Sequence, residues 1–186
     1  MKKKQLLLAS VAMFASGIVS ANTGLYIGAD IALSNETELE DNGISITADN
    51  DPGYNFVVGY DMQTHDSVKI GFEGEYRTFG EVKYSNIVTV DGNGVFLNAK
   101  PKLYAQGSNV YFAGLFGVGK MDLDITSTLT GVTTNESSSA LQYGAEIGFE
   151  FEQNLVLNAG YRAATAEIEG TDVTVSGLYA GARFKF

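Results

Sequence analysis

The sequence predicts an all-β fold, an eight-stranded antiparallel up-and-down transmembrane β-barrel that forms after a signal peptide is removed. Three observations predict it: the chain starts like a secretory signal, segments of alternating apolar and polar residues recur to its end, and long and short connectors alternate between them. Successive side chains of a strand point to opposite faces. The last segment, Tyr179–Phe186, therefore has an apolar face and a charged face, which need two different solvents.

Residues 1–21 are predicted to be the signal peptide. Met1–Lys4 is positively charged, Leu6–Val19 is apolar, and Val19-Ser20-Ala21 supplies small residues at the expected cleavage point. A transmembrane helix is the alternative, but the apolar stretch is shorter than the ~20 residues that cross a bilayer. Residues 22–186 are then a single outer-membrane β-barrel domain.

Composition agrees with a closed β-sheet. The chain has no cysteine, 22 glycines, 11 phenylalanines, 10 tyrosines and only two prolines. A closed barrel leaves no strand edge unpaired, so it needs no cross-link. Without the three signal lysines, nine bases and 22 acids give the remaining chain a formal charge of −13. Nucleic acid is an unsuitable partner for such a chain.

The first four strands follow from alternation bounded by polar segments. In each, aliphatic or aromatic residues alternate with glycine, amide or charged residues, and the expected ranges are 23–34, 54–62, 68–79 and 95–104. The intervening connectors, long, short and long, are 35–53, 63–67 and 80–94. Asp91-Gly92-Asn93-Gly94 predicts a turn that closes a protruding hairpin. Pro101 lacks an amide donor and is expected at an edge or bulge.

The last four strands follow the same rule with one exception. Their expected ranges are 110–123, 140–151, 155–166 and 173–186. Connector 105–109 precedes the first of them, and connectors 124–138, 152–154 and 167–172 separate successive strands. The segment 110–123 has apolar bulk on both faces, so its register stays open. Eight strands with three short and four longer links match the smallest transmembrane barrels, with both ends of the mature chain at the short-turn end.

The apolar face is predicted to face lipid and the polar face the interior. Fourteen charged residues fall on the polar face, with acids and bases nearly balanced as a buried interior requires. They are Asp30, Asp61, Lys69, Glu73, Glu75, Arg77, Lys100, Lys102, Lys120, Glu146, Glu150, Arg162, Arg183 and Lys185. The net negative charge lies in the long connectors and their flanks, which hold 14 acids and one base, Lys83.

Aromatic residues of the apolar face gather near both strand ends, as two interfacial girdles require. Those near the short turns are Tyr60, Phe149, Phe151, Phe184 and Phe186, and those near the long connectors are Tyr54, Tyr76 and Tyr143.

The signal, the alternation and the terminal Phe184-Lys185-Phe186 resemble the small eight-stranded outer-membrane barrels of Gram-negative bacteria, a group that includes the OmpA transmembrane domain, OmpX and the broader porin-like family. The resemblance covers the whole mature chain. It implies the cell outer membrane as the location and outer-membrane lipids and lipopolysaccharide as surroundings. It also implies that the assembly machinery reads Phe184 and Phe186.

The function predicted from these features is a non-enzymatic, monomeric barrel with a structural or surface-interaction role, its acidic loops facing an extracellular ligand or host surface. An eight-stranded barrel is just wide enough for side chains to fill it. We expect Asp61 to oppose Lys69 and Glu73 to face Lys100. The expected lumen charge network is Asp30, Asp61, Lys69, Glu73, Glu75, Arg77, Lys100, Lys102, Glu146, Glu150, Arg162 and Arg183. A narrow porin-like channel for ions or small solutes is the alternative.

Other functions have weaker support. Some eight-stranded barrels modify lipid A with a histidine and a serine, but the single histidine, His65, lies beside Asp66 and Ser67 in an expected solvated turn. The acidic connector 35–53 lacks the spacing of a calcium loop, although divalent ions bridging it to lipopolysaccharide stay open. No metal or cofactor site is expected. A soluble ligand-binding barrel is the remaining alternative.

Overall fold

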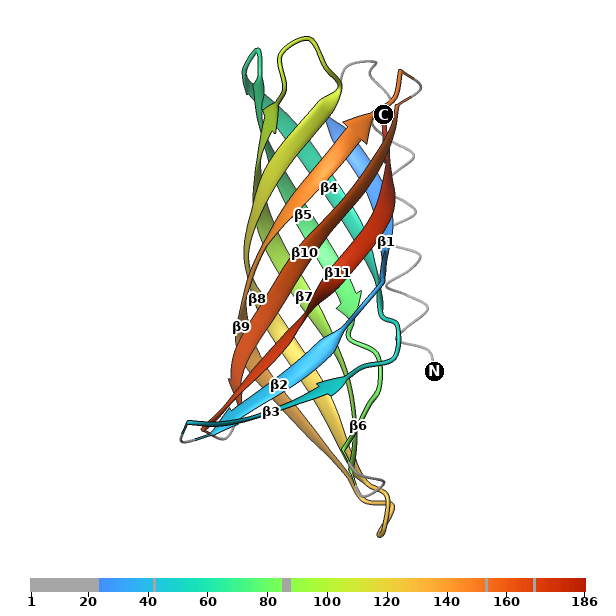
Figure 1. Cartoon of the computed structure of the whole chain (residues 1–186), viewed down its shortest axis with the longest axis vertical. Helices are drawn as coiled ribbons and strands as arrows, with labels where there is room; N and C mark the ends of the chain where they lie inside the picture. Colours follow the sequence, from blue (N-terminus) through green and yellow to red (C-terminus); the bar gives the residue numbers. More distant parts are fainter. Residues whose placement is uncertain (1–23, 42, 85–87, 153, 169) are drawn as a thin grey trace.

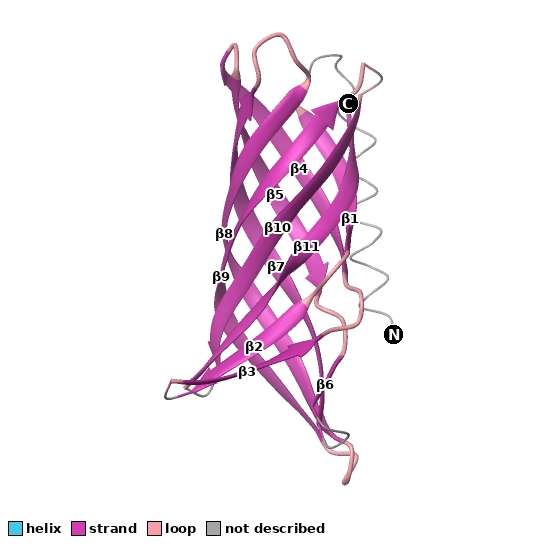
Figure 2. Cartoon of the chain, viewed as in Figure 1, coloured by secondary structure: helices cyan, strands magenta, loops and turns pink. Residues whose placement is uncertain are grey.

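The computed structural model describes residues 24–41, 43–84, 88–152, 154–168 and 170–186. The fold is all-β and antiparallel, and its strands form a tall closed cylinder (Figures 1 and 2). The eight barrel strands are β1 (Leu25–Ala32), β4 (Tyr54–His65), β5 (Val68–Thr78), β7 (Val88–Tyr104), β8 (Val110–Ser127), β9 (Thr133–Glu150), β10 (Leu155–Ile168) and β11 (Thr171–Lys185). The predicted signal peptide lies outside the described residues. In the described part of the chain, no helix is long and apolar enough to span a membrane.

The first and last strands close the ring. Each barrel strand pairs with the next, and β1 pairs with β11 from Tyr26↔Lys185 to Ala32↔Tyr179. The amide of Phe186 also donates to the carbonyl of Leu25 at 3.0 Å. The eight-stranded barrel predicted from the alternation is therefore confirmed, and its seam leaves no open edge along β1.

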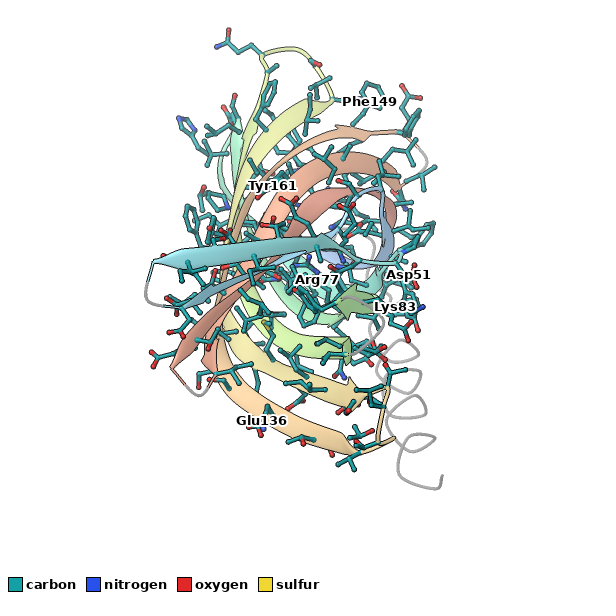
Figure 3. All side chains as sticks on the ribbon, turned by 60° about the horizontal axis from the view of Figure 1, so that its bottom comes forward. Asp51, Arg77, Lys83, Glu136, Phe149 and Tyr161 are labelled. Atoms are coloured by element: carbon teal, nitrogen blue, oxygen red, sulfur yellow. The ribbon has the colours of Figure 1, made fainter. Side chains whose placement is uncertain are left out.

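Alternating exposure confirms which face is which. Along β4, Phe56 is 56% exposed whereas its neighbour Asn55 is fully buried, and the same alternation runs through the other barrel strands. Outward-facing aliphatic and aromatic side chains cover the middle of the cylinder, which suits a lipid solvent. Figure 3 shows Phe149 and Tyr161 on the outside of the ring of strands.

The aromatic residues expected at the two interfaces point outward. Tyr60, Phe149 and Phe184 lie toward the short turns, and Tyr54 and Tyr143 lie toward the other end, each of them exposed. Phe184 and Phe186 contact one another edge to face, with ring centroids 5.4 Å apart. Short turns mark the periplasmic end of such barrels, so the opposite end is extracellular.

The long connectors were wrongly expected to be loops. Connector 35–53 contains β2 (Glu36–Asp41) and β3 (Ile44–Asp49), and 80–94 contains β6 (Val82–Tyr84) and the start of β7. Strands β8 and β9 extend far into 124–138. Clear alternation is present in β3, where Ile44, Ile46 and Ala48 alternate with polar residues, and Gly43 adopts the positive φ that the β2–β3 turn needs.

The additional strands build a second tier on the barrel. Strand β2 pairs with the extended part of β11, β3 pairs with β2, and β6 pairs with the extended part of β7. A single bridge, Asn50↔Val82, links the end of β3 to β6. Strands β2, β3 and β6 thus take the places that β1, β4 and β5 occupy nearer the membrane (Figure 1).

The predicted turn at Asp91–Gly94 was also wrong. These residues lie inside β7 and pair with residues 121–124 of β8. A Cβ at Gly92 would lie 2.4 Å from Leu123 Cδ2, and one at Gly94 would lie 2.5 Å from Phe96 Cε2. The glycines therefore make room for apolar packing inside the barrel and do not form a turn.

Two further points of register are settled by the pairings. Pro101 lies opposite Ile70 of β5, while the β7–β8 ladder passes from Ala99↔Phe116 to Lys102↔Ala113 without a pair at Pro101. Its missing amide therefore falls in a gap of that ladder. Along β8, Tyr111 and Met121 are buried inside and Phe116 is outside, which fixes the register that the sequence left open.

Candidate functional site

The barrel interior is the candidate site, and it changes character along its axis. Its membrane-level part, named here the charged layer, is filled by buried ionic, amide and tyrosine side chains. Its extracellular part, named here the apolar cap, is a cluster of Phe79, Phe96, Met121, Leu123, Ala140, Ala164, Ala166, Ile168, Val173 and Val175. Figure 3 shows Arg77, at the junction of the two, inside the ring of strands behind the β2–β3 hairpin.

Glu146 of β9 is the centre of the charged layer. Its carboxylate accepts hydrogen bonds from Lys100 Nζ at 2.9 Å and from the hydroxyls of Tyr111 and Tyr179 at 2.8 Å each. Arg183 Nη2 lies 3.4 Å from it. Side chains from several strands therefore donate to one buried carboxylate. An ionised group needs such partners to remain stable away from water.

Arg183 of β11 links Glu146 to two further carboxylates. Its Nη1 donates to Asp30 Oδ1 at 3.0 Å, and its Nε lies 3.5 Å from Glu73 Oε1. Glu73 also accepts from Lys100 Nζ at 3.1 Å, which confirms the expected Glu73–Lys100 pair. Two bases and three acids thus form one continuous network.

A second group of polar side chains lies nearer the cap, around Glu75 of β5. Its carboxylate accepts from Arg162 Nη1 at 3.1 Å, Asn98 Nδ2 at 2.6 Å and Gln142 Nε2 at 2.7 Å. Arg162 also contacts Asp30 at 3.3 Å and so joins this group to the network around Arg183. The amides satisfy carboxylate lone pairs that the single guanidinium leaves open.

At the periplasmic mouth the pairing differs from the prediction. Asp61 contacts Lys102 at 2.7 Å and Lys185 at 3.2 Å, whereas Lys69 contacts Glu150 at 3.3 Å. The expected Asp61–Lys69 pair was wrong because β4 and β5 continue to His65 and Val68, so that Gln63, not Asp61, lies opposite Lys69. Glu150 also contacts Lys185 and the hydroxyl of Tyr104.

Arg77 differs from the other interior bases. It is buried, and its guanidinium donates to two neutral acceptors, Gln142 Oε1 at 3.4 Å and Asn35 Oδ1 at 3.3 Å. Its other neighbour is the ring of Phe79, 5.2 Å away, where a cation–π contact forms. A cation held by amides and an aromatic ring marks the boundary between the charged layer and the apolar cap.

Three tyrosines of the charged layer lie across glycines of the adjacent strand. The directly paired partners are Tyr26 and Gly59, Tyr111 and Gly148, and Tyr179 and Gly160. A Cβ at Gly148 would lie 2.2 Å from Tyr111 Cζ, and one at Gly59 would lie 2.4 Å from Tyr26 Cζ. The absent side chains let the rings lie flat, and their hydroxyls then reach Glu73 and Glu146.

Loop residues hold the cap over the charged layer. The carbonyl of Phe79 accepts from Asn35 Nδ2 at 2.6 Å and from Asn50 Nδ2 at 3.1 Å, and Thr37 donates to Asn50 at 2.9 Å. The hydroxyl of Tyr84 donates to the carbonyl of Thr37, and burial raises the pKa of Tyr84. These bonds join the β2–β3 hairpin and its two ends to Phe79 and to β6.

The extracellular tier is strongly acidic. Beyond the membrane level, the described residues include 13 acids and only two bases, Lys83 and Lys120. The acids are Glu36, Glu38, Glu40, Asp41, Asp49, Asp51, Glu81, Asp91, Asp122, Asp124, Glu136, Glu167 and Asp172. Lys120 was expected on the interior face, but it is exposed on the outside, 3.7 Å from Asp122. Along β8 the odd-numbered residues face the interior from Tyr111 to Leu123, so the expected inner and outer faces of this strand were exchanged.

The twelve residues predicted for the lumen network all lie in the barrel interior, with Lys69 and Glu150 partly exposed at the mouth. The prediction omitted Lys185, the tyrosines, and the amides of Asn55, Asn98, Gln142 and Asn158 that complete the hydrogen bonds. Tyrosine on the polar face and glycine on the neighbouring strand were the available signal for the tyrosines.

The turn with the only histidine offers no catalytic arrangement. The amide of Asp66 donates to His65 Nδ1 at 2.9 Å, and both residues are exposed. Among the residues that the structure describes, no three histidine, cysteine or acidic side chains are arranged to hold a metal ion.

The fold and its interior define a small integral outer-membrane barrel. The sequence matches the family described as "Outer membrane protein beta-barrel domain" over residues 6–186, and the chain belongs to this family. The family places the protein in the outer membrane of a Gram-negative bacterium. No curated protein matches the chain by sequence.

Several solved structures have the same fold. The Neisserial surface protein A aligns with a TM-score of 0.66 and 17% identity, covering 88% of this chain and 97% of that one. Ail, the attachment invasion locus protein of Yersinia pestis, gives 0.54 and 21%, covering 86% and 98%. The N-terminal barrel of Pseudomonas aeruginosa OprF gives 0.50 and 14%, covering 88% and 100%. At these identities the likeness concerns the fold.

Proposed function

We propose that the protein is a non-enzymatic, non-conducting barrel whose sealed interior anchors an extracellular interaction surface. The observation that carries this proposal is that two different layers of side chains fill the barrel interior, one after the other along its axis. The charged layer occupies the narrow membrane-level part, and the apolar cap lies above it, with Phe96 and Met121 fully buried. An apolar constriction excludes water and ions, and paired charges offer no continuous free path.

The interior also supports a structural function. Each carboxylate of the charged layer contacts bases from other strands, so a strand that slipped in register would lose these partners. A slip by one residue also turns charges toward lipid, at about 2–4 kcal/mol for a Lys or Arg at the midplane. The network therefore fixes the register of the barrel that holds the extracellular tier.

The acidic tier is the part that meets other molecules. Ail has been crystallised with the heparin analogue sucrose octasulfate, which is a polyanion. The tier described here has 13 acids and two bases, so the same kind of ligand is repelled. The interaction partners of this protein are cationic or bring cations with them.

Catalysis has no support in the geometry. His65 uses Nδ1 within its own turn, and the buried carboxylates are held by bases and hydroxyls on several sides. A catalytic group needs access to substrate and a base within reach of a nucleophile.

Single-channel recording in planar lipid bilayers tests the sealed interior. The refolded protein is expected to give no reproducible unitary conductance, while its heat-modifiable migration on a gel shows that it is folded. Regular current steps from folded protein would reject the proposal in favour of a narrow channel.

A further inference from the structure

The extracellular tier has one open seam. Strand β3 pairs with β2 on one side, and among the described residues its other side is joined to β6 only by the bridge at Asn50↔Val82. Figure 1 shows the β2–β3 hairpin diverging from the long β8–β9 hairpin at this end of the molecule. From this bridge back toward Ile44, the backbone of β3 is therefore available to an added strand.

The interior face of β3, beside the seam, is apolar. Ile46 lies directly opposite Leu39, which in turn lies opposite Val173 of the apolar cap, so the three side chains share the interior face. Ile44 is two residues along the same face. Ile44 is 69% exposed and Ile46 is 57% exposed, whereas Val173 is buried. The apolar cap thus continues into two uncovered isoleucines at the rim.

Acidic groups surround these isoleucines. The segment from Glu36 to Asp51 contains six acids and no base. Across the mouth from the hairpin lies Glu136, which Figure 3 places at the extracellular end of the ring. A cationic partner is attracted to this rim, and a second copy of the chain, with the same acidic hairpin, is repelled.

We propose that the open edge of β3 binds an extended cationic peptide segment in which basic and apolar residues alternate. The peptide adds as a strand beside β3, places its apolar side chains on Ile44 and Ile46, and turns its basic side chains toward the acidic outer face. This inference rests on the proposed surface-interaction function and names the class of partner. It commits to a peptide because a lipid chain cannot use the free backbone groups of β3.

The test uses the full-length mature barrel refolded in nanodiscs and a fluorescent peptide of alternating lysine and valine. Fluorescence anisotropy measures binding, and a matched peptide of alternating glutamate and valine is the charge control. We expect saturable binding of the lysine peptide that weakens as salt is raised, and no binding of the glutamate peptide.

Two N-methylated peptides separate strand addition from attraction of charge alone. In an extended peptide, the amides of the valines point to one edge and those of the lysines to the other. Methylation of one set is expected to weaken binding at least tenfold, while methylation of the other set leaves it nearly unchanged. Equal behaviour of the two methylated peptides would overturn strand addition.

Variants locate the site. Ile44→Ser combined with Ile46→Ser is expected to weaken binding about tenfold or more, because the peptide loses its apolar contacts. Leu129→Ser is the control, since Leu129 is 78% exposed near the β8–β9 turn and away from β3. Equal affinity of both variants and the unaltered protein would overturn the inference. Conductance measured on the same preparation reports separately on the sealed barrel.

Discussion

Tyr111 of β8 lies flat across Gly148 of β9, its direct partner in the sheet, and its hydroxyl donates to Glu146, which is two residues from Gly148 on β9. The relationship combines packing and electrostatics. The glycine provides the space, the ring fills it, and the hydroxyl stabilises the carboxylate at the centre of the charged layer. Equivalent pairs at Gly59 and Gly160 suggest that the interior is built by this device repeatedly.

Replacing Gly148 with alanine is expected to destabilise the barrel. The new Cβ would lie 2.2 Å from Tyr111 Cζ, and the ring cannot move without leaving Glu146. Overpacking of this kind costs about 1–3 kcal/mol, measured as the free energy of unfolding in urea from lipid bilayers. Gly74→Ala is the control, because its Cβ meets no atom closer than 3.7 Å. Equal stability of the two variants would show that the ring adapts freely.

The Glu73–Lys100 pair is expected to show strong coupling in a double-mutant cycle. Both side chains are almost completely buried and lie 3.1 Å apart. Removing one partner of such a pair costs about 3–5 kcal/mol because the other charge stays buried. Lys100→Met should be the more harmful single change, since it also leaves Glu146 without its nearest base. The free energies of unfolding of Glu73→Gln, Lys100→Met and the double variant measure the coupling. Additive effects would show that the two charges do not stabilise one another.

Replacement by methionine is expected to cost much more stability at one buried arginine than at another. Arg183 contacts Asp30, Glu73 and Glu146, so Arg183→Met should cost about 3–5 kcal/mol of unfolding free energy. Arg77 donates to neutral amides, so Arg77→Met removes a buried cation along with two weak hydrogen bonds, and the change should stay within about 1 kcal/mol. Equilibrium unfolding of the two variants compares them. A loss for Arg77→Met as large as that for Arg183→Met would mean that its charge is compensated more strongly than its contacts indicate.

The sequence contains enough information for the barrel and its two faces because alternation is a local property. Period two separates the two faces of a strand, and the near-balance of acids and bases then identifies the face with Asp30, Glu73 and Arg183 as the interior. Pairing across strands is different, since it depends on where each turn closes. The tight turn after His65 moves Lys69 opposite Gln63, which no alternation pattern reveals.

The extracellular tier could not be predicted for a related reason. Its strands alternate weakly, and their polar outer faces look like loop sequence. Gly92 looks like a turn residue because Leu123, the side chain that needs its space, comes close only after β7 and β8 pair. The apolar cap is therefore a product of tertiary pairing.

Asn35 and Asn50, named here the asparagine clasp, lie above Arg77 and are expected to hold the extracellular tier in place. Replacing Asn35 and Asn50 by alanine removes both side-chain donors to the carbonyl of Phe79. We expect faster proteolysis between residues 36 and 51 while the membrane-level barrel keeps its heat-modifiable migration. Asn135→Ala is the control, because Asn135 bonds to Asp124 on an exposed surface of the β8–β9 hairpin. Unchanged proteolysis in the clasp variant would mean that β2–β11 pairing suffices to fix the hairpin.

Sealing by two layers in series predicts a specific pattern of conductance. Phe96→Ala with Met121→Ala opens the apolar cap but leaves the charged layer closed, so the variant should remain silent in planar bilayers. Glu146→Ala with Arg183→Ala opens the charged layer, yet an intact cap should still exclude water and ions. Only the combination of both pairs is expected to conduct, provided that gel migration shows it is folded. Conductance from the cap variant alone would show that the ion pairs exchange partners fast enough to pass ions, and that the cap is the only seal.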